Sequence, residues 1–166
     1  LYSPHFQTYN RNKRSIALDT KKPEDLQVLH DLVASADVFI QNFRPGVAEK
    51  LGAGEADLRK VNPDLIYCAI SGFGRTGPSK DRPAYDTVAQ AASGYLRLLT
   101  PPVNPRVIGP AIADAVTGQY AALGILVVEG VELEELGLRL LASGGAARPM
   151  GGARPLAVGR LLERRV

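Results

Sequence analysis

Apolar residues between positions 16 and 128 recur at two spacings, one typical of strands and one typical of helices. Short apolar runs predict strands at 15–18, 38–40 and 65–70, and the last two are expected to be buried. A helix is predicted to open at Pro23, because acidic residues follow it and later apolar residues return every three or four positions. This alternation predicts a layered α/β fold.

Further helices are predicted at 47–51, 56–61 and 84–96, and a glycine-rich loop is predicted at 71–78. The loop contains G-x-G-x-x-G after a strand, a pattern typical of dinucleotide-binding turns. Pro78 follows the third glycine at once, so no helix opens on the loop to present its N-terminus to a pyrophosphate. The pattern therefore does not predict a nicotinamide-type site.

One carboxylate, Asp114, stands in the otherwise apolar or small-residue run 107–126. Burying a carboxylate without a partner is costly, so this acid requires a structural or a chemical reason. A helix cap is the simpler reason, because Asp114 directly precedes a helical pattern formed by Val116, Tyr120 and Leu123. A catalytic carboxylate is the alternative, and the segment alone leaves both interpretations open.

Composition narrows the class of protein. The chain has 166 residues, of which 45% are hydrophobic and 22% charged, and this suits one modest globular domain. The net charge of +3 is too small to favour a nucleic-acid partner. Neither His5 nor His30 has companions at metal-ligand spacing, so no metal site is expected.

The chain carries one cysteine, Cys68, so no disulfide can form within it, and a reducing, cytoplasmic location is the simplest expectation. Residues 1–10 lack the apolar centre of a signal peptide. The longest apolar run, 121–128, is too short to cross a bilayer. We therefore expect a soluble, intracellular protein with no membrane partner.

The composition changes near the C-terminus. From Val131 onward the chain has no Lys, Asp, Asn, Phe or Tyr and is rich in Gly, Ala, Arg, Leu and Pro. We therefore divide the chain into a domain over 1–128 and an atypical tail over 129–166 that is expected to be linker, disordered or translated from a shifted reading frame.

Four segments, in matching order and spacing, together resemble the family III CoA-transferases of the CaiB/BaiF type. They are N-R-N-K-R-S-I-A-L-D at 10–19, Q-N-F-R-P-G at 41–46, I-Y-C-A-I-S-G-F-G with T-G-P at 66–78, and A-D with T-G at 113–118. The resemblance covers about residues 3–128. It implies a Rossmann-like layered sheet with flanking helices that forms part of a transferase large domain.

The resemblance implies an enzyme that moves coenzyme A from an acyl-CoA to a free carboxylic acid, with CoA as substrate and no permanently bound cofactor. Asp114 takes the position of the family's nucleophile, which attacks the thioester and forms a mixed anhydride. A place at a helix start would keep Asp114 ionised, so the cap and nucleophile interpretations are compatible. Intact members form interlocked homodimers, a feature that a chain this short is not expected to keep.

The resemblance also implies a set of contacts to CoA. Basic members of the set can meet phosphates, and Phe43 offers an aromatic face, although each basic residue alone also fits solvated surface charge. Some family members carry a lysine in place of Pro83, and Arg82 is the expected substitute. The implied contacts are Leu18, Lys21, Asn42, Phe43, Arg44, Lys50, Arg82, Pro83, Ala84 and Tyr85.

Two alternatives remain open at this point. The first is an α-methylacyl-CoA racemase, which uses a His-Asp pair where this chain has Tyr85-Asp86. Tyrosine, with an ordinary pKa near 10, is a poor proton acceptor at neutral pH, and this favours the transferase. The second is an inactive, truncated product, because the family's first strand-helix unit is missing before Leu1 and the family pattern stops after Leu126.

Overall fold

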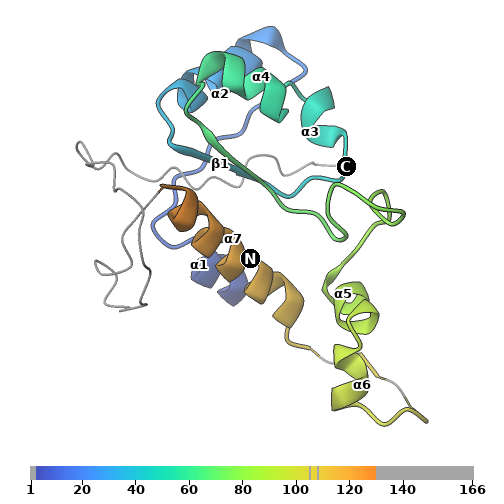
Figure 1. Ribbon diagram of the computed structural model, residues 1–166. Coiled ribbons are helices and arrows are strands. Elements are labelled where there is room, and N and C mark those ends of the chain that lie inside the picture. The colour runs from blue at the N-terminus through green and yellow to red at the C-terminus, as the bar shows by residue number, and fades with distance from the viewer. Residues whose placement is uncertain (1–2, 105, 108, 130–166) are drawn as a thin grey trace, which may run out of the picture. The chain divides into compact units, whose positions relative to one another are not determined.

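The computed structural model describes residues 3–104, 106–107 and 109–129 (Figure 1). The described chain forms two compact units. The first contains the residues up to 41 together with 46–67, and the second contains 42–45 together with the residues from 68 onward.

The first unit is built on a strand–helix–strand connection. Its helices α2 and α4 pack on one another, and strands β1 and β2 pair in a small parallel sheet. β2 leads out of this unit into the second. The elements are α1 (Pro4–Tyr9), α2 (Pro23–Ala34), β1 (Val38–Gln41), α3 (Val47–Lys50), α4 (Glu55–Val61) and β2 (Ile66–Ala69).

The first unit has an apolar core of leucines and valines. Leu58 of α4 and Leu65, which directly precedes β2, are its most completely buried large side chains. Two polar side chains connect the elements around the core. The Asn62 amide donates to the carbonyls of Val33 (3.1 Å) and Ala36 (2.7 Å), and further along the chain the Tyr67 hydroxyl donates to a loop carbonyl. The core residues are Leu18, Leu29, Val33, Ala53, Leu58 and Leu65.

The second unit contains three helices, α5 (Asp86–Ala92), α6 (Tyr95–Leu99) and α7 (Ile112–Glu129). α5 packs against both of the others. Among the described residues of this unit, the buried side chains are Gln90 of α5 and Ile125 of α7. Apolar burial therefore contributes less to the packing of the described residues here than in the first unit.

The α/β class predicted from the alternating pattern is confirmed, and so is the helix that opens at Pro23. The strands predicted at 38–40 and 65–70 are present as β1 and β2, but they are mostly half-buried rather than fully buried. The strand predicted at 15–18 is absent, and the segment has no regular structure although the Leu18 side chain lies in the core. Leu18 therefore serves packing without strand pairing, whereas Ile16 is 44% exposed.

The helix predicted over 84–96 is wrong in its extent. The structure divides it into α5 and α6, and Gly94 between them adopts a left-handed backbone with φ of 80°. Only glycine takes that conformation at low cost, so the chain turns there instead of continuing the helix. A short helix that the pattern did not predict, α1, begins after Ser3, whose side chain accepts the Phe6 amide (3.3 Å).

Helix α7 is more extended than its apolar run suggested. The helix has 18 residues and is, by length and composition alone, long and apolar enough to cross a membrane. One such helix is weak evidence for a span, because helices of soluble proteins meet the same test. The tail predicted over 129–166 lies outside the described residues apart from Glu129, the last residue of α7.

Candidate functional site

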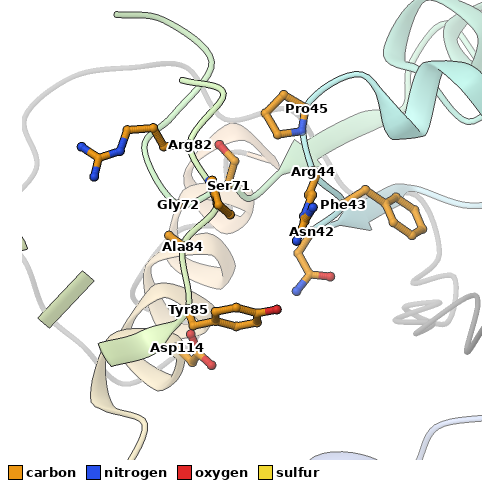
Figure 2. Close-up of a pocket in the computed structure, with 11 residues that line it drawn as sticks. Asn42, Phe43, Arg44, Pro45, Ser71, Gly72, Arg82, Ala84, Tyr85 and Asp114 are labelled. Atoms are coloured by element: carbon orange, nitrogen blue, oxygen red, sulfur yellow. The ribbon is translucent and has the colours of Figure 1, made fainter. Parts of the chain in front are cut away.

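A pocket of about 300 Å³ lies in the second unit, at the lower end of the range typical of small-molecule sites (Figure 2). Its walls come from the loop that follows β1, the loop that follows β2, the segment before α5 and the first turn of α7. Ligands of open α/β sheets commonly bind beyond the carboxyl ends of the strands. The lining residues are Asn42, Phe43, Arg44, Pro45, Ser71, Gly72, Arg82, Pro83, Ala84, Tyr85 and Asp114.

Two of these walls approach each other at Gly72. A Cβ placed on Gly72 would overlap the Cβ of Ala84 and lie 3.3 Å from its Cα. The glycine-rich loop therefore contacts the segment before α5 at a distance that a side chain would forbid. This contact alone explains why the loop needs glycine at position 72, and no bound dinucleotide is required for it.

Asp114 is the third residue of α7 and is exposed. The expectation that it caps the helix is wrong, because Ile112 and Ala113 precede it within the helix. In the part of the chain that the structure describes, its carboxylate accepts no hydrogen bond. Its expected burial is also not found, so the carboxylate is available at the pocket wall (Figure 2).

Asp86 supplies the cap that Asp114 does not. Its Oδ1 accepts hydrogen bonds from the backbone amides of Ala113 (2.7 Å) and Asp114 (3.2 Å), the second and third residues of α7. Its Oδ2 accepts a hydrogen bond from the side-chain amide of Gln90. The same Gln90 nitrogen lies 3.4 Å from the carbonyl of Pro110, two residues before α7 begins. One half-buried carboxylate thus connects the starts of two helices.

Two arginines and two aromatic residues are among those that line the pocket. Arg44 and Arg82 are both exposed, and the Arg82 guanidinium stacks over the Phe73 ring with its carbon 5.4 Å from the ring centre. Figure 2 shows the Arg82 side chain extending away from Asp114 and the Phe43 ring turned outward, whereas the Tyr85 ring lies beside Asp114 in this view. Tyr85 is 76% exposed, so its ring face is free for a ligand.

The structure brings together most of the residues that the sequence singled out. Asp114 lines the pocket with seven of the implied CoA contacts, namely those at 42–44 and 82–85. The other three lie in the first unit, where Leu18 is 8% exposed within the core and Lys21 and Lys50 are exposed on the surface.

Sequence reasoning missed four residues of this region: Pro45, Ser71, Gly72 and Asp86. Pro45 adjoins the predicted contact Arg44, whereas Ser71 and Gly72 lie in the predicted glycine-rich loop 71–78, which was not assigned to the site. Asp86 was considered only as part of a racemase-like pair. The sequence shows only that a distant acceptor is needed, because the residues from 109 to 113 offer no side-chain acceptor for the amides that open α7, and it does not point to Asp86.

Two other candidates contribute little to the site. Cys68 lies in β2 outside the pocket lining, and burial raises the pKa of its thiol. A raised pKa lowers the thiolate fraction at neutral pH and makes the sulfur a poor nucleophile. Within the described residues there is no group of three or more His, Cys, Asp or Glu side chains that could hold a metal ion.

A family model, curated proteins and solved structures each match this chain, and all three point to the same family. Residues 2–128 match the sequence profile of CoA-transferase family III. The chain is 41% identical over 123 residues to succinyl-CoA:glutarate CoA-transferase of Homo sapiens, covering 72% of this chain and 27% of that protein. It is 43% identical over 125 residues to acetyl-CoA:oxalate CoA-transferase of Acetobacter aceti, covering 74% and 32% respectively.

A crystal structure of a CAIB/BAIF family protein from Brucella suis matches with a TM-score of 0.67 and 40% identity, over 77% of this chain and 34% of that chain. The chain therefore spans about a third of the length of the proteins it matches. The family resemblance found in the sequence is confirmed, and relatives named as transferases do not favour the racemase alternative.

Proposed function

Because this chain belongs to CoA-transferase family III, we propose that its protein transfers coenzyme A from an acyl-CoA to a free carboxylic acid through Asp114. The observation that carries the proposal is the exposed Asp114 carboxylate at a pocket whose other walls include the segments 42–45 and 82–85. A nucleophilic carboxylate needs access to the thioester, and this position provides it.

The proposed reaction begins with attack of an Asp114 oxygen on the thioester carbonyl carbon. The carbon–sulfur bond breaks, CoA leaves as the thiolate, and a mixed anhydride remains on Asp114. The thiolate then attacks the aspartyl carbonyl and releases the donor acid, which leaves an aspartyl thioester. The acceptor carboxylate repeats both exchanges in reverse and leaves as the new acyl-CoA. Aspartate suits these steps because its carboxylate is both a nucleophile and a leaving group.

The two arginines that line the pocket with Asp114 favour a ligand with an anionic part, and we propose that its reacting end is the thioester. A pocket of about 300 Å³ holds only part of a molecule as long as CoA, and we assign that part to the thioester and the adjoining arm. Arg44 and Arg82, which line the pocket, are our proposed contacts to phosphate oxygens, for which a guanidinium is well suited. Lys21 and Lys50, both exposed, remain proposed phosphate contacts.

Oxygen transfer tests the mechanism directly. We propose to incubate the chain with an acyl-CoA and a carboxylic acid labelled with ¹⁸O in both oxygens, and to analyse its peptides by mass spectrometry. The anhydride route leaves one acceptor oxygen on Asp114, because the bridging oxygen stays there when CoA takes the acyl group. Label should appear in the peptide with Asp114 and in no other peptide.

Two variants serve as controls for that experiment. Asp114→Ala should lose the labelled peptide and lower any transfer rate at least about a thousandfold, because no other described residue of the pocket lining is a carboxylate. Asp81→Ala removes an exposed carboxylate outside the pocket lining and should behave like the wild type. Transfer that survives in Asp114→Ala contradicts the nucleophile role. A chain that shows neither CoA binding nor label contradicts the proposed function, and the inactive product considered from the sequence is then the interpretation.

A further inference from the structure

We propose that Asp86 is a positioning residue for Asp114: it holds the first turn of α7 so that the Asp114 carboxylate stays free at the pocket wall. The inference rests on the proposed function, since Asp114 must be the nucleophile for its position to matter. It goes beyond that function by assigning a role to a residue that does not line the pocket.

The first step of the argument concerns the amides that open α7. The first amides of a helix have no partner within it, and a carboxylate at the third position often turns back to bond at the helix start. Here Asp86 Oδ1 accepts the amides of Ala113 and Asp114. A charged acceptor on these amides makes it unnecessary for the Asp114 side chain to turn back, so that side chain remains exposed.

The second step concerns what holds Asp86. Its other oxygen accepts a hydrogen bond from Gln90, one turn further along α5 and only 3% exposed. Gln90 also lies within hydrogen-bond distance of the Pro110 carbonyl, at 3.4 Å. The carboxylate is therefore fixed at both oxygens, and the segment leading into α7 is attached to α5 by a second contact. A side chain held in this way can locate a helix start accurately.

The hydrogen bonds that Asp86 accepts from the start of α7 and from Gln90 together form a brace. The third step connects this brace with the pocket. Tyr85 lines the pocket and is followed directly by Asp86, so the segment 82–85 and the start of α7 share one anchoring residue. A ligand that moves Tyr85 therefore acts close to the residue that holds Asp114. Small errors in the position of a reacting group are costly, since a displacement of about 1 Å lowers rates by about a hundredfold.

The test compares Asp86→Ala with Asp86→Asn in the chain itself. The asparagine keeps an oxygen that can accept the two amides, whereas alanine keeps none. We expect Asp86→Ala to slow labelling of Asp114 by about a hundredfold and to leave the dissociation constant for CoA within about threefold, because Asp86 is outside the pocket lining. Asp86→Asn should recover most of the rate, and Asp81→Ala should match the wild type.

Amide hydrogen exchange gives a readout that does not depend on activity. The amides of Ala113 and Asp114 should be protected in the wild type and in Asp86→Asn, and they should exchange freely in Asp86→Ala. Equal exchange in wild type and Asp86→Ala, or an unchanged labelling rate with a folded variant, would overturn the inference. A wild-type chain with protected amides but neither CoA binding nor label contradicts the proposed function. In that case Asp86 still holds the start of α7, but its hydrogen bonds have no role in catalysis.

Discussion

The two units of this chain are held together in different ways. In the first, Leu58 and Leu65 are almost fully buried and belong to an apolar core shared by α2 and α4. In the second, the buried side chains among the described residues are one amide, Gln90, and one isoleucine, Ile125. The pocket lies in the second unit. The comparison teaches that the site is placed where hydrogen bonds rather than apolar burial set the geometry, as is common for segments that bind ligands.

The comparison is tested most strongly by opening a cavity in each unit. Leu58→Ala should lower the free energy of unfolding of the first unit by about 2–5 kcal/mol, because a fully buried leucine leaves an unfilled space. Amide exchange at 56–66 measures the loss. Ile125→Ala should cost no more than about 2 kcal/mol, the lower end of that range. Equal losses in the two units would contradict the difference proposed here.

The second test adds an atom where the pocket walls touch. Gly72→Ala should force the glycine-rich loop away from Ala84, with a penalty of about 1–3 kcal/mol, because the new Cβ would overlap the Ala84 side chain. We expect weaker CoA binding by calorimetry, with little change in exchange at the core of the first unit. Unchanged affinity in a folded Gly72→Ala chain would show that the close contact does not shape the pocket.

A third change should stabilise the second unit. Gly124 lies inside α7, and a Cβ placed there meets no atom within 4 Å. Gly124→Ala should therefore raise helix stability by about 0.5–1 kcal/mol, because alanine loses less backbone entropy on folding. A thermal melt followed by circular dichroism measures the gain. A loss of stability would indicate that another surface packs against this position.

The smallest effect concerns Cys68. Because burial raises the pKa of this thiol, the folded chain should hold less thiolate than the unfolded chain at every pH below that pKa. Iodoacetamide should therefore react more slowly with the folded chain than with the chain in urea, and the difference should shrink as the pH rises through the raised value. Equal rates at pH 7 would mean that β2 opens rapidly around this residue.

Much of the fold could be predicted from local signals. Pro23 with its following acidic residues marks the start of α2, and two apolar runs mark β1 and β2. The apolar spacing predicted the wrong local structure at two places. Gly94 ends a helical pattern by its backbone conformation. The run at 15–18 contributes Leu18 to the core without pairing as a strand.

The site shows the other limit of sequence reasoning. The family motifs brought Asp114 together with the segments 42–44 and 82–85 in one list, and the structure places these residues around one pocket. The cap on α7 could not be read from neighbouring residues, because Asp86 is 27 positions from Ala113. Asp114 resembled a cap because acids near helix starts usually are caps, and only the packing of α5 on α7 shows that another acid holds that position.

The hydrogen bond between Asp86 and Gln90 predicts how these two positions vary among related sequences. Asp86 accepts a hydrogen bond from Gln90 at one oxygen and from the start of α7 at the other, and the Gln90 side-chain nitrogen contacts both Asp86 and the carbonyl of Pro110. Replacing either polar side chain alone by an apolar one leaves a polar group of the partner without its bond, whereas a joint change can keep both satisfied. In a collection of related sequences, positions 86 and 90 should therefore vary together, and exchanges at one of them should be tolerated mainly in backgrounds that have already changed at the other.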